Sequence, residues 1–142
     1  MLGIFVLPLV AALVASVLGF VWFGPLFGKH YMRVMGITPE MAESGKKSMM
    51  PKMLLDFVMS FIMFFGLLMI LNIAQAGTYS AAFIFTLLFW AFIMLPTKAS
   101  GVIWSNKNTK DSWVMFGLTA GYSLVSYLVS ALLFIALIPL FI

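Results

Sequence analysis

The sequence predicts an all-α membrane protein with four transmembrane helices and a short interfacial amphipathic helix after the first of them. Three observations support this fold class. Of the 142 residues, 64% are hydrophobic and only 8% are charged, whereas a soluble domain is about half apolar and about a quarter charged. Four apolar runs are each long enough to cross a hydrocarbon core of roughly 30 Å. The lysines and arginines cluster beside alternate runs, as expected for a multi-pass protein, and we expect one transmembrane domain over residues 1–142.

The composition also excludes several kinds of site. The chain has no Cys, which rules out disulfides and thiolate chemistry. With one His and four carboxylates, neither a metal site nor a cofactor is expected, and no phosphate-binding or dinucleotide-binding motif is present. The net charge of +4 comes from basic residues in two short segments between apolar runs, and neither segment is dense enough in Lys and Arg to follow a nucleic-acid backbone. The lipid bilayer is therefore favoured over nucleic acid as a partner.

The first predicted span covers about residues 2–23. No basic segment precedes it, which indicates a retained helix rather than a cleaved signal peptide. Ala11, Ala15 and Gly19 recur every four residues and form a stripe that lets another helix approach closely. We interpret the stripe as a packing face within the fold, and a dimer face is the alternative.

The junction after this span is the most distinctive segment of the chain. Trp22 and neighbouring aromatic residues are suited to a bilayer interface. Pro25 lacks an N–H and must break or bend the helix, while Gly24 and Gly28 permit a sharp change of direction or a close contact.

Apolar residues at helical spacing follow the junction. They predict an amphipathic helix over about residues 26–36, lying in the headgroup plane with Lys29 on its polar face and Gly36 as its C-cap. The alternative is a plain extension of the first span into water. His30, beside Lys29, is expected to contact headgroups rather than to act in catalysis. Thr38 is predicted as the N-cap of a further helical turn that starts at Pro39.

The next two spans are predicted at about residues 51–76 and 80–104. The segment 44–48 before them is the most loop-like part of the chain. A short uncharged turn at 77–80 should join the two spans as an antiparallel hairpin. Pro96 lies inside the third span, where it predicts a kink.

A polar loop is predicted at 105–112, followed by a fourth span over about residues 113–141. Gly117 and Gly121 form a GxxxG pair, which is typical of close helix packing in membranes. A second stripe of small polar residues lies on another side of this span: Thr119, Ser123, Ser126 and Ser130.

The basic residues predict the orientation. They lie beside the first and third loops only, at Lys29, Arg33, Lys46, Lys47, Lys52, Lys98, Lys107 and Lys110. By the positive-inside rule, these two loops face the cytoplasm and both termini lie outside it.

Two charged residues within the spans are the strongest candidates for a site. Asp56 and Lys98 each lie roughly 8–9 Å inside the cytoplasmic end of their spans, at about 1.5 Å per residue. Charges at this depth usually pair or line a cavity. The first interpretation is an ion pair that holds the hairpin, or a Lys98 that snorkels to the interface. The second is a polar vestibule in which Asp56 binds a cation or proton, extended by Ser60, Thr97 and Ser100.

The junction and the last span carry a family resemblance. The segment Gly19–Met32, followed by Gly36, resembles a bacterial membrane family catalogued as domain of unknown function 1761, and the segment 120–126 is similar to its last span. The resemblance implies a short protein of four spans in the bacterial inner membrane, and it implies no activity.

Three functions remain open from the sequence. The first is a homo-oligomeric or accessory membrane module without enzyme activity, associating with its own copies or another membrane protein through the small-residue stripes. The alternative is a transporter or channel component with a vestibule around Asp56 and Lys98. An enzyme acting on lipid, with His30 or Asp56 as base, is the least favoured because no second catalytic group accompanies either residue.

Overall fold

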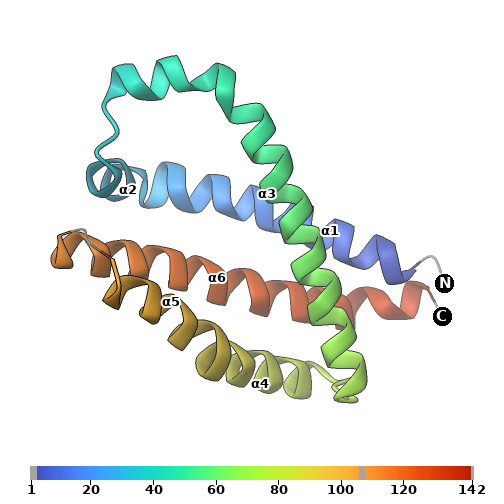
Figure 1. Ribbon diagram of the computed structural model, residues 1–142. Helices are drawn as coiled ribbons and strands as arrows, with labels where there is room; N and C mark the ends of the chain where they lie inside the picture. Colours follow the sequence, from blue (N-terminus) through green and yellow to red (C-terminus); the bar gives the residue numbers. More distant parts are fainter. Residues whose placement is uncertain (1–2, 106–107, 142) are drawn as a thin grey trace.

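The computed structural model describes residues 3–105 and 108–141 (Figure 1). Within these described residues, nine helical elements follow one another: α1 (Gly3–Val21), the π-helix η1 (Trp22–Leu26), α2 (Gly28–Met35), α3 (Pro39–Ile73), α4 (Tyr79–Phe89), the π-helix η2 (Trp90–Met94), α5 (Leu95–Ile103), α6 (Thr109–Leu137) and the 3-10 turn η3 (Ile138–Leu140). Four helical stretches are long and apolar enough to cross a membrane: Gly3–Leu26, Pro39–Ile73, Tyr79–Ile103 and Thr109–Leu140. The predicted fold class is therefore confirmed.

The last long helix, α6, is the centre of the bundle. It contacts α1, α2, α3, α4 and α5, whereas α1 packs chiefly on α3 and α6. In Figure 1 the two termini and the α3–α4 turn lie at one end of the molecule. The helix α2, the end of α5 and the start of α6 lie at the other end, which we call the α2 end. Successive connections between the long helices thus lie at opposite ends, as expected for four consecutive membrane spans.

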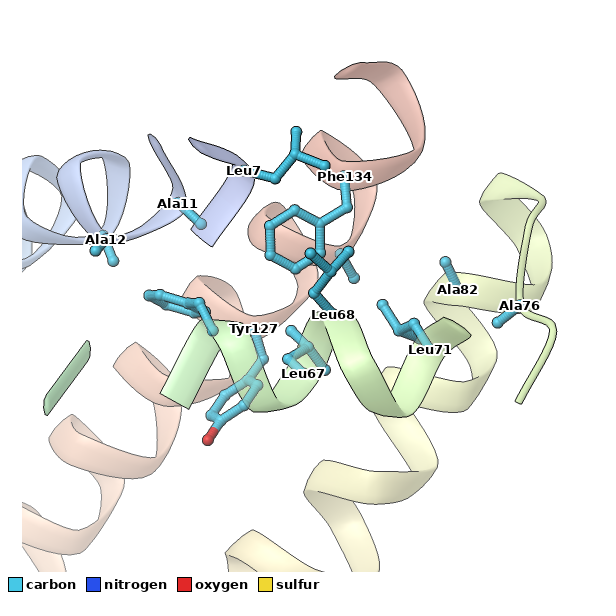
Figure 2. Packing of buried hydrophobic residues seen from close by; sticks show 13 residues of the cluster. Leu7, Ala11, Ala12, Leu67, Leu68, Leu71, Ala76, Ala82, Tyr127 and Phe134 are labelled. Atoms are coloured by element: carbon cyan, nitrogen blue, oxygen red, sulfur yellow. The ribbon is translucent and has the colours of Figure 1, made fainter. Parts of the chain in front are cut away.

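The core lies where α1, α3 and α6 meet. Figure 2 shows Leu7 of α1 and Leu68 of α3 meeting at the ring of Phe134 in α6. Ala11 has no exposed surface, and neither do Phe64 and Phe134. Lipid tails are as apolar as these side chains, so van der Waals contact and close helix approach hold the core, rather than transfer out of water.

One long helix, α3, replaces the loop that we expected at 44–48. The loop prediction is wrong, and the helix begins at Pro39 rather than near Pro51. The Thr38 hydroxyl caps it by accepting a hydrogen bond from the N–H of Met41 at 3.2 Å, as predicted. The serines at 44 and 48 donate to backbone carbonyls within the helix, so these polar residues are satisfied without a loop.

Helix α3 is bent in its first third (Figure 1). Pro51 lies inside the helix and has no N–H to donate to the preceding turn. Its ring also crowds that turn, which is the usual cause of a sharp kink. The first part of α3 therefore leaves the bundle as a polar arm, which carries the ion pair of Lys46 with Glu43 at 2.9 Å.

The junction helix is a separate element. Figure 1 shows α2 nearly end-on while α1 runs across the view, so the chain turns steeply instead of extending the first span in a straight line. Gly36 ends α2 with a left-handed backbone at φ 64°, as predicted for a C-cap glycine.

Both predicted proline breaks coincide with π-helices. Pro25 lies within η1, where the N–H of Phe27 donates to the carbonyl of Trp22 at 2.9 Å, five residues back. Pro96 follows η2, where Leu95 donates to Trp90 in the same i to i−5 pattern. A wider turn relieves the clash between a proline ring and the carbonyl four residues before it.

Candidate functional site

Asp56 and Lys98 are not brought together. The ion pair present among residues 3–105 and 108–141 joins Lys46 and Glu43 instead. The expected contact is wrong because α3 packs on α1, whereas α4 and α5 pack on α6. The two spans are joined by a short turn but diverge from it, as Figure 1 shows, and they do not pair along their length.

The other residues of the expected vestibule lie on two elements: Ser60 is one turn from Asp56 on α3, whereas Thr97 and Ser100 are on α5. Asp56 and Ser100 are exposed and Ser60 is half-buried. The hydroxyl of Thr97 donates to the carbonyl of Ile93 at 2.6 Å, within its own helix. A vestibule between Asp56 and Lys98 therefore does not form in this arrangement.

Lys98 instead lines a pocket of about 500 Å³ at the α2 end, which we call the α2–α5–α6 pocket. Three helices build its wall. Its polar lining consists of Lys98, Ser105, Asn108, Asp111, Ser112 and Thr119, and its apolar lining consists of Val34, Met35, Val102, Met115 and Phe116, with Gly101 beside them. A pocket of this size is in the range of small-molecule sites.

Local structure explains why Asp111 and Ser112 reach this pocket. We expected a loop over 105–112, but α6 already begins at Thr109. The side chain of Asn108 caps it by accepting a hydrogen bond from the N–H of Lys110 at 3.0 Å. Asp111 then lies in the first turn, where a carboxylate is favoured by the helix dipole. Two residues of the predicted loop, 106 and 107, lie outside the described residues.

The hydroxyl groups of the pocket are bonded to the protein. Ser105 and Ser112 share a hydrogen bond of 3.0 Å between their oxygens. Thr119 donates to the carbonyl of Met115 at 3.0 Å, one turn back in α6. These bonds hold the wall of the pocket.

Lys98 and Asp111 both line this pocket, yet they form no ion pair with each other. Within the described part of the chain, neither side chain makes a hydrogen bond to any other group. Lys98 is half-buried and so is Asp111. The site thus presents one cation and one anion to whatever occupies it.

Charged, polar and apolar side chains line the pocket over more than two turns of α6. Asp111 lies in the first turn of α6, and Thr119 lies about 12 Å further along the helix axis, at 1.5 Å per residue. Met115 and Phe116 lie between them, and Val34 of α2 faces the same space. The same pocket therefore has both charged and apolar side chains in its lining, and an amphiphilic molecule needs both kinds of contact.

The junction packs onto the middle of α6, close to this pocket. The indole N–H of Trp22 donates to the carbonyl of Leu118 at 3.1 Å. The ring of Trp22 lies 4.8 Å from that of Phe27, measured between centroids. Gly28 is buried, and a Cβ on it would stand 2.9 Å from the carbonyl oxygen of Phe23. The chain therefore needs glycine at this point of the turn.

The second contact between the junction and α6 involves Tyr122. Its hydroxyl donates to the carbonyl of Ala15 at 2.8 Å. Its ring lies 5.3 Å from that of Phe23, and a Cβ on Gly19 would approach its hydroxyl oxygen to 3.1 Å. We did not predict a role for Tyr122 or Leu118. The resemblance of segment 120–126 to a family span was the available signal.

Of the other residues predicted for helix packing or for the junction, some are packed against other helices and some are exposed. Ala11 and Ala15 are buried in the fold, and Gly121 faces the ring of Trp22. Gly24 and Gly117 have no neighbour within 4 Å of an added Cβ. The residues Pro25, Lys29 and His30 are exposed.

A second indole is anchored in the same way. Trp90, the first residue of η2, donates its N–H to the Ser123 hydroxyl at 2.9 Å. That hydroxyl in turn donates to the carbonyl of Ala120 at 2.9 Å. Each π-helix thus begins with a tryptophan whose N–H is bound by α6.

Another pocket, of about 450 Å³, lies at the opposite end, between the ends of α1, α3 and α6. Its lining is mostly apolar, with Leu7, Phe134 and Phe141 among its residues. The amides of Asn72 and Gln75 are its polar side chains. The amide of Gln75 already donates to the carbonyl of Asn72 at 3.0 Å. Among the described residues that line it, none has a charged side chain.

These features define a small four-helix membrane protein, whose first-span junction and last span pack together beside a pocket with two charged side chains. The sequence profile of one family, described as protein of unknown function (DUF1761), matches residues 7–135, and the chain belongs to this family. No curated protein and no solved structure matches the chain.

Proposed function

We propose that this protein is an integral protein of the bacterial inner membrane that binds an amphiphilic molecule of the bilayer in the α2–α5–α6 pocket. The observation that carries the proposal is the lining of this pocket, which combines an apolar wall with two charges that make no ion pair within residues 3–105 and 108–141. Membrane lipids have the same two-part chemistry, and they surround the protein at high concentration.

The orientation supports access from the cytoplasmic leaflet. The basic residues Lys29 and Arg33 lie on α2, and Lys110 lies at the start of α6. All three belong to the α2 end (Figure 1). By the positive-inside rule this end faces the cytoplasm, and both termini then lie on the other side. The pocket would then lie at the depth of the inner-leaflet headgroups.

Binding is favoured over conduction by the separation of the two pockets. They lie at opposite ends and have no lining residue in common. The packed core of α1, α3 and α6 includes Ala12, Phe64 and Tyr127. A transporter or channel component would need a path between the ends, and Asp56 lines neither pocket.

A homo-oligomeric or accessory role is the second candidate. It needs a surface other than the small-residue stripe of the first span. The stripe of span one is used inside the chain, where Ala11 and Ala15 are buried. The third span supports this candidate, because only 11% of its most apolar window is buried within the chain. Its side chains Phe92 and Ile93 are 72% and 53% exposed.

Native mass spectrometry of the protein released from mild detergent tests both candidates, with the retained molecules identified by lipid analysis. We expect a stoichiometric lipid that is lost in Gly101→Leu, because Gly101 lines the pocket and an added side chain meets no backbone there. Gly117→Leu is the matched control, since Gly117 is equally open and lies outside the pocket. Equal lipid retention in both variants would exclude the pocket as the binding site. A defined oligomer without lipid would favour the second candidate.

A further inference from the structure

We infer that the α2–α5–α6 pocket selects a zwitterionic headgroup, with an anionic group beside Lys98 and a primary ammonium beside Asp111. This inference rests on the proposed binding function and names the class of ligand. The headgroup of phosphatidylethanolamine has both charges, on a phosphate and on a primary amine. Two acyl chains attached to such a headgroup would have the apolar wall of the pocket available.

The two charges carry the argument. Lys98 and Asp111 are the only ionisable side chains among the described residues that line the pocket. No ion pair joins them, so the Nζ of Lys98 and the carboxylate oxygens of Asp111 are more than 4.0 Å apart. Two half-buried charges of opposite sign are costly to leave apart at a membrane interface. A ligand that carries both charges compensates each of them, whereas a singly charged ligand leaves one unpaired.

The paired serines add a hydrogen-bond donor to the lining of the same pocket. Ser105 and Ser112 share one hydrogen bond, so one hydroxyl uses its hydrogen for the other and the second keeps its own hydrogen to donate. Ser112 follows Asp111 directly in α6. The pocket lining therefore contains, besides Lys98, a hydroxyl donor for an anionic oxygen.

The lining also distinguishes a primary amine from a quaternary one. A primary ammonium has three N–H donors for the Asp111 carboxylate, while a trimethylammonium has none. Quaternary ammonium groups are instead bound by cages of several aromatic rings. Phe116 is the one aromatic side chain among the described lining residues. The pocket is thus suited to ethanolamine rather than choline.

Delipidated protein titrated with lipids of identical acyl chains tests this inference by native mass spectrometry. We expect phosphatidylethanolamine to bind about tenfold more tightly than phosphatidylglycerol or phosphatidylcholine, which corresponds to about 1.4 kcal/mol. Asp111→Asn should abolish the preference over phosphatidylglycerol, and Lys98→Gln should weaken the binding of both lipids. Lys110→Gln and Asp56→Asn are matched controls outside the pocket, and both should bind as the unaltered protein does.

The outcomes separate this inference from the function on which it rests. If Asp111→Asn still prefers phosphatidylethanolamine over phosphatidylglycerol, the inference of a zwitterionic headgroup is wrong. A loss of lipid binding in Gly101→Leu would still support a lipid pocket. If Gly101→Leu also binds every lipid normally, both proposals fail. Phosphoethanolamine without acyl chains is the remaining arm. If phosphoethanolamine binds as tightly as phosphatidylethanolamine, the pocket still selects a zwitterionic group. The ligand would then be a soluble molecule rather than a lipid of the bilayer. Thermal unfolding of each variant shows whether it is folded.

Discussion

The indole N–H of Trp22 donates a hydrogen bond of 3.1 Å to the carbonyl of Leu118, 96 residues further along the chain. Through this contact the junction after the first span is attached to the middle of the last one. The ring of Trp22 then lies over Gly121, so that an added Cβ would stand 3.0 Å from its Cζ2 atom. The two segments that carry the family resemblance are therefore in direct contact.

The contact between Trp22 and Gly121 predicts that this glycine is required for stability. Gly121→Leu should lower the free energy of unfolding by about 1–3 kcal/mol, because the new side chain must displace the Trp22 ring. Gly117→Leu is the control, as it adds the same side chain to the same helix in open space. The midpoint of thermal unfolding in detergent compares the two. Equal midpoints would mean that the indole does not pack closely on α6.

The junction turn supplies a second glycine pair. Gly28→Ala should be destabilising by about 1–3 kcal/mol, since its Cβ would meet the backbone oxygen of Phe23 at 2.9 Å and the backbone has to move. Gly24→Ala, four residues earlier, meets nothing within 4 Å and should be tolerated. Unfolding in increasing denaturing detergent measures both variants. A stable Gly28→Ala protein would contradict the tight turn at η1.

The hydroxyl of Thr86 is fully buried and has no hydrogen-bond partner in the described part of the chain. Thr86→Val keeps the shape and removes the unsatisfied group, so we expect a stability equal to that of the unaltered protein or up to about 1 kcal/mol higher.

Ser123→Ala is the contrasting variant, because Ser123 accepts the N–H of Trp90 at 2.9 Å. Its removal should cost about 1–3 kcal/mol by leaving that N–H without a partner. Thermal unfolding of both variants in one detergent provides the comparison. A marked loss of stability in Thr86→Val would show that its hydroxyl makes a bond in the native protein.

The separation of Asp56 and Lys98 is open to a direct test, because the chain has no native Cys. A double variant with Asp56→Cys and Lys98→Cys should not form a disulfide under mild oxidation, since α3 and α5 diverge. The positive control is Ser105→Cys with Ser112→Cys, whose oxygens lie 3.0 Å apart. Mobility on a non-reducing gel reports both. Rapid cross-linking between positions 56 and 98 would show that the two residues lie side by side, as the sequence predicts for an antiparallel hairpin.

The proposed orientation predicts a pattern of chemical labelling. A cysteine at Ser48, on the polar arm of α3, should be protected from a membrane-impermeant thiol reagent in intact cells. A cysteine at Gly77, in the α3–α4 turn, should be labelled. Both positions are exposed in the fold, so protection would reflect the membrane and not burial. The reverse pattern would place the termini in the cytoplasm.

Local features of the sequence predicted much of the fold. Four apolar runs separated by polar segments indicate four spans, because a bilayer requires long apolar helices. Gly36 and Thr38 were predicted as caps, and the backbone and side-chain geometry at both residues agrees. Each of these features depends on residues within one or two turns. The segment 44–48 is the local failure, because helix capping and hydrogen bonds within the turn outweighed its loop-like composition.

The candidate site depended on long-range packing instead. The sequence indicates that Lys98 is a charge in need of a partner, and its spacing predicts Asp56 on the neighbouring span as that partner. The helices α4 and α5 pack on α6 rather than on α3. Lys98 therefore lines a pocket with Asp111 and not with Asp56.

What the sequence by itself determined is therefore the number of spans and the places where the chain turns, since these follow from apolar length, prolines and glycines. What only the tertiary structure decided is which helices are neighbours, and with that which side chains share a pocket. Apolar helix faces are chemically alike in lipid, so the choice of neighbour depends on close shape contacts such as that of Trp22 with Gly121. Such contacts join residues far apart in the chain and leave no periodic signal in the sequence.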